Sequence, residues 1–406
     1  MDTSFISVEA AMSLRRIRFP ARWGSLALAA LLTACGGGGG GSNGSLPQGG
    51  GASGIAIAFT TPASEEVLAA DIGVAITARV TVNGTDAADG TSVRFSATPG
   101  SFSATGTTLN GVATVVLVGV TPGRQELNAS ASVSGQTATA ARVVYLRATP
   151  APLTLLVPAY FYPSSTGSHW DRMTASAQAF PAVSITAIMN PNNGIFTAAD
   201  PNFVRSAGQF VAAGGKVLGY VHTRYGNGTR TLADIKANID AYLSLYGRGI
   251  ISGIFLDEMS ADAGRLPFYR ELHEHIKAQD PHLQVVGNPG TVPAAGYAGV
   301  TDVLVTFEGN SAGFQAYDPR HTPWLYGHIN AGESALVHNV ATCAAMQDAV
   351  KLAASARYNT GPVYMTDLEF DPVTGTGNPW AALPAYWNAL IQAVNAANQG
   401  ARPPAC

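Results

Sequence analysis

Eight short apolar segments, rich in β-branched and aromatic residues, alternate with longer amphipathic segments between residues 153 and 366. The amphipathic segments have helical spacing and helix-boundary residues; one begins at Asp200 with Pro201 in its first turn and ends before Gly214. This alternation predicts parallel strands joined by helices. The apolar segments are Leu153–Pro158, Val183–Met189, Lys216–Val221, Ile251–Leu256, Gln284–Gly287, Val303–Phe307, Ala335–His338 and Pro362–Thr366.

Eight such units in about 250 residues match the size of a (β/α)8 TIM barrel. We therefore expect an α/β fold with a closed barrel over residues 152–400. The competing topology is an open, doubly wound sheet, which commonly carries a glycine fingerprint after its first strand. No such fingerprint follows Leu153–Pro158, so the barrel is favoured.

Residues 55–148 have a period of two instead, because apolar and polar residues alternate one by one, as at Ile76, Ala78 and Val80. Turn-forming pairs such as Asn83-Gly84 separate these stretches. Short strands at this spacing predict an all-β sandwich domain. The stretch Asp89–Gly123 resembles the bacterial Ig-like domains of the invasin type. We expect this domain to be a spacer or a weak binding module.

The first 54 residues are typical of targeting and tether sequences. Arginines from Arg15 to Arg22 precede the apolar stretch Gly24–Ala34, which is too short to span a bilayer and indicates an export signal. The four residues ending at Cys35, Leu-Thr-Ala-Cys, resemble the lipobox of bacterial lipoproteins, whose cysteine is lipidated. We expect residues 1–35 to be a lipoprotein signal peptide and residues 36–54, rich in glycine and serine, to be a flexible linker.

These features predict an exported protein, lipid-anchored at the outer membrane or cell surface of a Gram-negative bacterium. In an oxidising compartment Cys343 and Cys406 are candidates for a disulfide, although spacing alone does not decide whether they pair. Only 12% of residues are charged and the net charge is −3, so no nucleic-acid partner is expected. We expect a monomer. No HExxH or cysteine-rich metal pattern occurs, and we expect neither metal nor cofactor.

Carboxylates stand where a barrel places its chemistry, at the C-terminal ends of the strands. The segment Ile251–Leu256 delivers Asp257 and Glu258 to the rim, and the segment two strands further on ends in Glu308. Burial and mutual repulsion should raise the pKa of at least one of these carboxyls. Backbones two strands apart allow either the close carboxylate spacing of a retaining glycosidase or the wider spacing of an inverting one.

Other polar and aromatic residues at or near the strand ends are predicted to contact substrate: Tyr160, Tyr162, Asn190, Tyr220, His222, Asn288, His338 and Asp367. A strand-end histidine can orient a carboxylate, contact substrate or satisfy a loop, and all three interpretations stay open. Aromatic residues of this region can stack on sugar or pack in the core; besides the tyrosines above they are Trp170, Tyr225, Trp324 and Trp380.

Short motifs follow one another in a fixed order: Pro158–Pro163, Asn190–Gly194, Gly219–Thr223, Gly253–Glu258, Asn288–Thr291, Thr306–Glu308 and Leu383–Trp387. Together they resemble the spherulation-specific (spherulin-four) family over about residues 153–395. The resemblance implies a barrel-fold glycoside hydrolase that cuts α-1,4-linked, N-acetylgalactosamine-containing exopolysaccharide. It also implies a retaining mechanism with Asp257 as nucleophile, Glu308 as acid/base and Glu258 as a supporting group.

A second class of function fits the same residues. The barrel would bind a surface polysaccharide without cleaving it, and the protein would be a cell-surface lipoprotein or adhesin. Release of reducing ends from an amino-sugar polymer separates the two classes. The sequence leaves open which polymer is natural and whether cleavage is endo or exo, and the endo mode is the one we predict.

Overall fold

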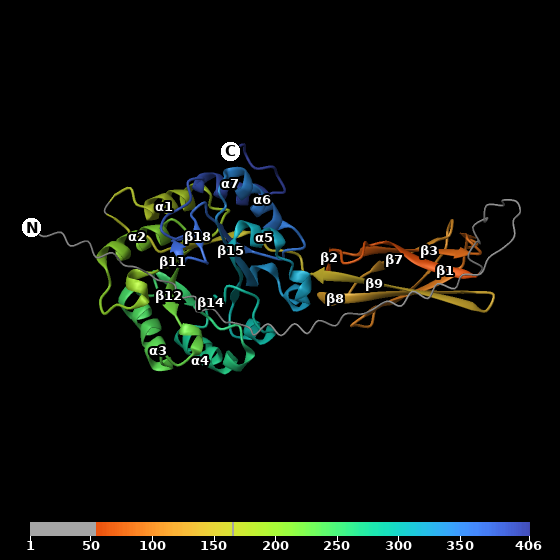
Figure 1. The fold of residues 1–406 in the computed structure, drawn as a ribbon, viewed down its shortest axis with the longest axis horizontal. Coiled ribbons are helices and arrows are strands. Elements are labelled where there is room, and N and C mark those ends of the chain that lie inside the picture. The colour runs from red at the N-terminus through yellow and green to blue at the C-terminus, as the bar shows by residue number, and fades with distance from the viewer. Residues whose placement is uncertain (1–53, 165) are drawn as a thin grey trace, which may run out of the picture.

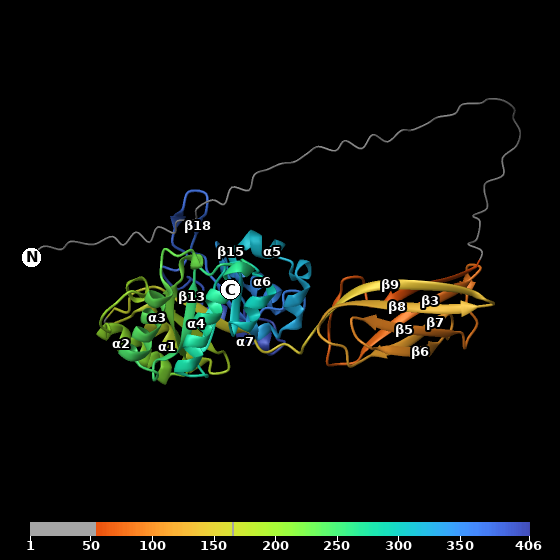
Figure 2. The same ribbon diagram turned by 90° about the horizontal axis from the view of Figure 1, so that it is seen from below.

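The computed structural model describes residues 54–164 and 166–406. It contains an all-β part at residues 55–147, followed by a barrel that begins at Thr154. Figures 1 and 2 show the two parts side by side along the longest axis of the molecule. The predicted signal peptide, its Cys35, and the linker as far as residue 53 lie outside the described residues.

Eight parallel strands close into a barrel in sequence order, and the last strand pairs with the first. The predicted barrel is therefore confirmed, and the open sheet is excluded. Each strand is buried along nearly its whole length, which explains why the segments are continuously apolar. The strands are β10 (Thr154–Ala159), β11 (Ile185–Met189), β12 (Lys216–His222), β13 (Ile251–Asp257), β14 (Gln284–Gly287), β15 (Val303–Asn310), β16 (Glu333–His338) and β17 (Pro362–Met365).

Helices surround the barrel (Figure 1). They are α1 (His169–Ala179), α2 (Pro201–Ala212), α3 (Leu232–Ala241), α4 (Leu266–Gln279), α5 (Ser311–Ala316), α6 (Cys343–Ala354) and α7 (Trp387–Asn398). Asp200 caps α2 by accepting a hydrogen bond from the backbone N–H of Asn202, as the sequence predicts. After β14 the chain forms only a short 3-10 helix, Ala295–Gly299. In the described part of the chain no helix is both long and apolar enough to cross a membrane.

Two buried tryptophans connect the first and last helices of the barrel domain to each other and to the loop after β10. The indole N–H of Trp387 in α7 donates to the Ser176 hydroxyl in α1 (3.0 Å), and that of Trp170 donates to the Phe161 carbonyl (3.2 Å). Removing a buried ring of this size costs roughly 3–5 kcal/mol of folding free energy. Trp170 and Trp380 are 0% and 2% exposed, so both are core residues rather than sugar-stacking platforms.

The all-β part consists of two sheets packed on a shared apolar core. One sheet contains β1 (Ile55–Thr61), β3 (Val74–Val82), β4 (Thr85–Asp86) and β7 (Val112–Leu117). The other contains β2 (Val67–Ala69), β9 (Gln136–Arg147), β8 (Gly123–Val133), β5 (Ser92–Thr98) and β6 (Ser103–Thr107). The alternating pattern arises because every second side chain, such as Ile76, faces this core. The Ig-like assignment of this domain stays a prediction.

The all-β part, called the β-domain from here on, contacts the barrel through the segment that precedes β16. The rings of Tyr145 and Tyr326 lie 5.3 Å apart, and Arg320 forms an ion pair with Glu65. The Asn330 side chain bonds both backbone groups of Ala151 in the connection between the domains. Ala151 and Asn330 lie just before β10 and β16, so this contact is at the N-terminal ends of these strands.

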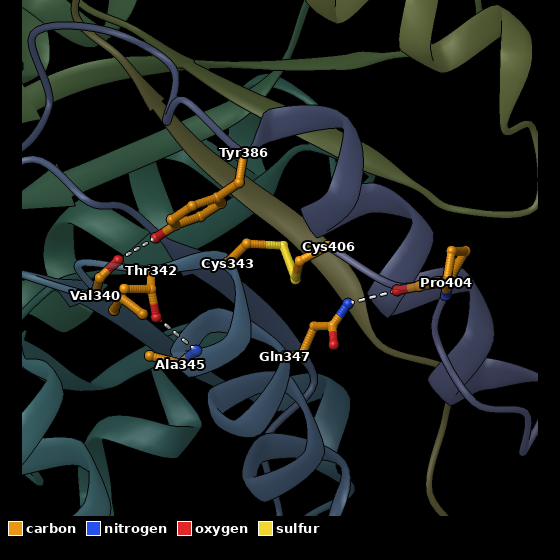
Figure 3. Close-up of a disulfide and its surroundings, with 8 residues drawn as sticks. All are labelled: Val340, Thr342, Cys343, Ala345, Gln347, Tyr386, Pro404 and Cys406. Carbon is orange, nitrogen blue, oxygen red and sulfur yellow. Dashed lines mark hydrogen bonds between the residues drawn. A yellow bond between two sulfur atoms is a disulfide. The ribbon is translucent and has the colours of Figure 1, made fainter.

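A disulfide joins Cys343, the first residue of α6, to Cys406 in the C-terminal tail (Figure 3). Nearby, the Gln347 side chain donates a hydrogen bond to the Pro404 carbonyl (2.8 Å). The tail is therefore held against α6 at two points.

The disulfide closes a segment with a sequence separation of 63 residues, and closing a long loop stabilises a fold mainly by restricting the unfolded chain. We expect Cys343→Ser to lower the free energy of unfolding by roughly 2–4 kcal/mol. Denaturant unfolding with and without a reductant measures this. Reductant should destabilise the wild type and leave the variant unchanged; equal stability of the oxidised wild type and the variant would contradict the expectation.

Candidate active site

Asp257 ends β13 as a buried carboxylate with two side-chain hydrogen-bond donors. The Tyr220 hydroxyl donates to its Oδ2 (2.8 Å), and the Asn288 Nδ2 donates to its Oδ1 (2.8 Å). Burial raises the pKa of Asp257, whereas these two hydrogen bonds act in the opposite direction. The donors come from β12 and from the end of β14, the two neighbours of β13 in the barrel.

The amide of Asn288 connects the two carboxyl groups. Its Nδ2 also donates to the Glu308 Oε2 (2.6 Å), while its Oδ1 accepts from the backbone N–H of Gly290 (3.0 Å). Because the amide oxygen has its own donor, the amide nitrogen must face the carboxyls. The linked oxygens of Asp257 and Glu308 are therefore no further apart than these two hydrogen bonds placed end to end.

Glu308 is aimed at this amide by an irregularity in β15. The pairing of β15 with β16 shifts between Val305 and Phe307, and such bulges re-aim the side chains that follow. The backbone N–H of Glu308 also donates to the Gly290 carbonyl (3.1 Å). Burial, and then the nearby charge of Asp257, raise the pKa of Glu308 to about 7. A carboxyl with this pKa can both donate and accept a proton near neutral pH.

Glu258 follows Asp257 but points elsewhere. Its backbone is left-handed (φ 50°), and its carboxylate lies 3.5 Å from the Arg224 Nε and 3.9 Å from the His222 Nδ1. Burial and the charge of Asp257 raise the pKa of Glu258, whereas Arg224 lowers it. Its side chain is 24% exposed, so it is open to a ligand in the mouth.

His222 is buried beside this group, and neither ring nitrogen has a hydrogen-bond partner within residues 54–164 and 166–406. Burial, followed by the charges of Arg230 and Arg224, lowers the pKa of His222 to about 4, so the ring is neutral near pH 7. A buried neutral imidazole with two free nitrogens is suited to a hydroxyl group of a ligand.

The other residues predicted from strand ends divide into two groups. The ring of Tyr160 meets that of Tyr220, the donor to Asp257, edge-on at 5.3 Å, so it belongs to the site. Burial, and then the charges of Asp257 and Glu308, raise the pKa of Tyr160. Tyr162 instead bonds Asp200, and Asp367 accepts from the backbone of Ala385.

Asn190 and His338 also stay apart from the carboxyl pair. The Asn190 Oδ1 is buried without a partner among the described residues. His338 packs against Phe370 and Trp380, at the base of the hairpin formed by β18 (Phe370–Asp371) and β19 (Thr376–Gly377), which Figure 2 shows projecting from the barrel. No hydrogen bond or ion pair joins either residue to Asp257 or Glu308 in the part of the chain that the structure describes.

Arg224 was not predicted from the sequence. It lies directly after His222 and Thr223 at the end of β12, and that position was the available signal. A Gly-x-Ser-x-Gly sequence at Gly309–Gly313 places Ser311 at the start of α5, but no hydrogen bond joins its hydroxyl to a histidine in the described chain. Likewise, no group of three or more metal-ligating side chains occurs among the described residues.

Comparison with known proteins identifies relatives of the barrel. Residues 154–394 match spherulation-specific family 4. Spherulin-4 of Physarum polycephalum is 39% identical over 167 residues, which are 41% of this chain and 48% of that protein, so the chain spans about half the length of this relative. The crystal structure of Aspergillus clavatus Sph3 in complex with GalNAc is 26% identical, with a TM-score of 0.50 over 60% of this chain and 97% of that one.

Replacing Glu308 by glutamine should change how stability depends on pH. Between the ordinary glutamate pKa of 4.5 and about 7, the unfolded chain loses the Glu308 proton while the folded protein keeps it. Folding of the wild type therefore weakens as pH rises through this window. The free energy of unfolding of Glu308→Gln, relative to that of the wild type, should therefore increase by roughly 1–3 kcal/mol between about pH 4 and about pH 8.

Urea unfolding at several pH values measures this gain. Glu369→Gln, which changes an exposed rim carboxylate, is the matched control. A stability difference between wild type and Glu308→Gln that stays constant over the whole pH range would show that the Glu308 carboxyl is not perturbed by burial.

Proposed function

The chain belongs to spherulation-specific family 4, and we propose that it is a glycoside hydrolase with Asp257 and Glu308 as its catalytic pair. The observation that carries the proposal is the Asn288 amide that holds both carboxyls. We propose an α-1,4-linked exopolysaccharide containing N-acetylgalactosamine or galactosamine as substrate, cut within the chain. The GalNAc bound to the related Sph3 supports an amino sugar.

The short distance between the carboxyls favours a retaining mechanism. Two hydrogen bonds of 2.8 and 2.6 Å to one nitrogen limit the distance between the Asp257 Oδ1 and the Glu308 Oε2, the nearer oxygens of the two groups. Retaining enzymes have carboxyls roughly 5–5.5 Å apart, whereas inverting enzymes need roughly 6.5–9.5 Å to fit a water molecule. Two carboxyls that share one amide donor fit the closer spacing better, and this supports the retaining mechanism that we propose.

In the first step the ionised Asp257 attacks the anomeric carbon, and protonated Glu308 gives its proton to the departing glycosidic oxygen. The glycosidic bond breaks, and a glycosyl ester forms on Asp257. In the second step Glu308, now ionised, removes a proton from water, and the water oxygen displaces Asp257 from the sugar. The product leaves with the original anomeric configuration, and both carboxyls return to their starting states.

The charge of Asp257 couples the two steps. That charge is one of the causes that raise the pKa of Glu308. When Asp257 becomes a neutral ester, this cause disappears and the pKa of Glu308 falls. Glu308 is therefore an acid when a proton must be donated and a base when water must be activated. The Tyr220 and Asn288 donors orient Asp257 and stabilise it as the leaving carboxylate. We assign Glu258, beside His222, to substrate support.

We also propose that the enzyme is exported and anchored by a lipid on Cys35, with the β-domain as an Ig-like spacer. The support is the basic segment, the apolar stretch and the Leu-Thr-Ala-Cys sequence. Bacteria that express the full chain should incorporate labelled palmitate into the wild type and not into Cys35→Ser. Equal labelling of both proteins would contradict the anchor.

Replacing either carboxyl of the pair should remove activity while leaving the fold intact. We expect Asp257→Asn and Glu308→Gln each to lower the release of reducing ends from galactosaminogalactan by about 10³-fold or more, and Glu258→Gln by roughly 10–100-fold. Glu369→Gln is the control and should behave as wild type. Full activity of Asp257→Asn or Glu308→Gln would refute the assignment, and binding without cleavage by the wild type would favour the polysaccharide-binding protein.

A further inference from the structure

Exposed apolar side chains line one part of the barrel mouth. Tyr162, Ile195 and Tyr225 are 56%, 49% and 45% exposed, and they follow the consecutive strands β10, β11 and β12. The carboxyls instead come from β13 and β15. We call these three residues the apolar arc. Large exposed apolar groups clustered beside a polar site commonly indicate a binding surface.

Tyr162 is exposed but fixed. Its hydroxyl donates to the Asp200 Oδ2 (3.0 Å) and accepts from the Asn202 Nδ2 (2.7 Å) at the start of α2. Its ring meets that of Phe203 edge-on at 5.7 Å. These contacts hold the ring in solvent rather than burying it. A ring already fixed loses little further conformational freedom when it binds a ligand.

Tyr225 is held by a strained turn. Arg224 and Tyr225 both have left-handed backbones (φ 50° and 56°), and the Tyr225 N–H donates to the carbonyl of Glu258, also left-handed (2.7 Å). Such conformations cost free energy in residues other than glycine and cluster at functional sites. Burial, and then the charges of Glu258, Asp257 and Glu308, raise the pKa of Tyr225. The backbone hydrogen bond to Glu258 places Tyr225 beside the residue that follows Asp257.

Ile195 lies on the loop between the two tyrosines. The preceding Gly194 has a left-handed backbone (φ 78°), and a Cβ there would clash with the Tyr220 carbonyl oxygen. Glycine therefore lets this loop approach β12 closely at Tyr220, the residue that donates a hydrogen bond to Asp257. The arc thus continues from the catalytic pair outward without a break in the strand order.

We propose that the apolar arc is a preformed stacking surface for successive sugar residues of the polymer, extending from the catalytic pair towards β10. The inference rests on the proposed glycosidase function and adds where the chain lies. Adjacent strands are about 4.8 Å apart, so the loops that carry Tyr162 and Tyr225 are anchored about 10 Å apart, enough for more than one sugar. Galacto-configured sugars present one face of C–H groups, which suits an aromatic ring with a polar edge. A surface of this length favours cleavage within a chain.

Kinetics on α-1,4-linked N-acetylgalactosamine oligosaccharides of graded length test the arc, with an aryl α-N-acetylgalactosaminide as the short substrate. For Tyr162→Ala we expect KM for the longest oligosaccharide to rise about tenfold, with the short substrate changed less than twofold. Tyr225→Ala should raise KM for the long substrate similarly, whereas Tyr225→Phe keeps the ring and should retain the long-chain KM. Leu245→Ala, an exposed apolar residue in the helical turn Tyr242–Tyr246 after α3, is the matched control.

The outcomes separate the arc from the catalytic assignment. If the wild type cleaves the series and both alanine variants keep its KM at every length, the arc is wrong and the glycosidase stands. If the wild type cleaves nothing, the proposed function fails, and calorimetry with the same oligosaccharides decides the arc. Tenfold weaker binding by Tyr162→Ala then supports it; equal affinity, or no binding by the wild type, overturns it.

Discussion

One side-chain amide, that of Asn288, connects the buried carboxyl of Asp257 to the partly buried carboxyl of Glu308 in the barrel mouth. Its oxygen is occupied by the Gly290 N–H, so its nitrogen must serve both Asp257 and Glu308. Two like charges at this separation in a poorly solvated site repel each other strongly, and the repulsion is relieved when one carboxyl keeps its proton. The proton resides on Glu308, whose pKa is raised to about 7, while Asp257 has two donors that favour the anion. The division of roles that we propose, Glu308 as acid and Asp257 as nucleophile, follows from this asymmetry.

Regular barrel strands bring these groups to one mouth, and local irregularities of the backbone then set the directions of some side chains. Barrel closure brings the ends of β12, β13, β14 and β15 to one mouth. The shift in β15 aims Glu308 at the amide, and the left-handed backbones of Glu258 and Tyr225 turn those side chains away from the directions that regular strands would give. The core tryptophans and the disulfide lie away from the carboxyls and hold the frame that supports these irregularities. The mouth that results has carboxyls on one part of its rim and the apolar arc on another.

The sequence predicts the barrel because each strand is buried on both faces and therefore has a continuous apolar sequence. The positions of Asp257, Glu258 and Glu308 follow from the same pattern, since they come at or next to strand ends; their catalytic roles stay predictions. Side-chain direction does not follow. Asp367 stands at the rim as predicted, yet it accepts from the Ala385 backbone. Tyr162 bonds Asp200 through its hydroxyl and keeps its ring exposed. Tyr220, predicted to contact substrate, bonds Asp257. These outcomes depend on strand stagger, on the β15 shift and on left-handed turns, which leave no periodic pattern in a single sequence.

A covalent intermediate on Asp257 is the most direct consequence of the account. A 5-fluoro-α-galactosaminyl fluoride transfers its sugar to a retaining enzyme, because fluoride is a good leaving group. Water then removes the sugar from the enzyme slowly, because the fluorine at C5 disfavours the positive charge that develops on the sugar. After incubation with the full-length protein, intact mass spectrometry followed by peptide mapping should find one added sugar, attached to Asp257, and none in Asp257→Asn. A label on Glu308 or Glu258 instead, or rapid turnover of the reagent with inverted configuration and no label, would contradict the central claim.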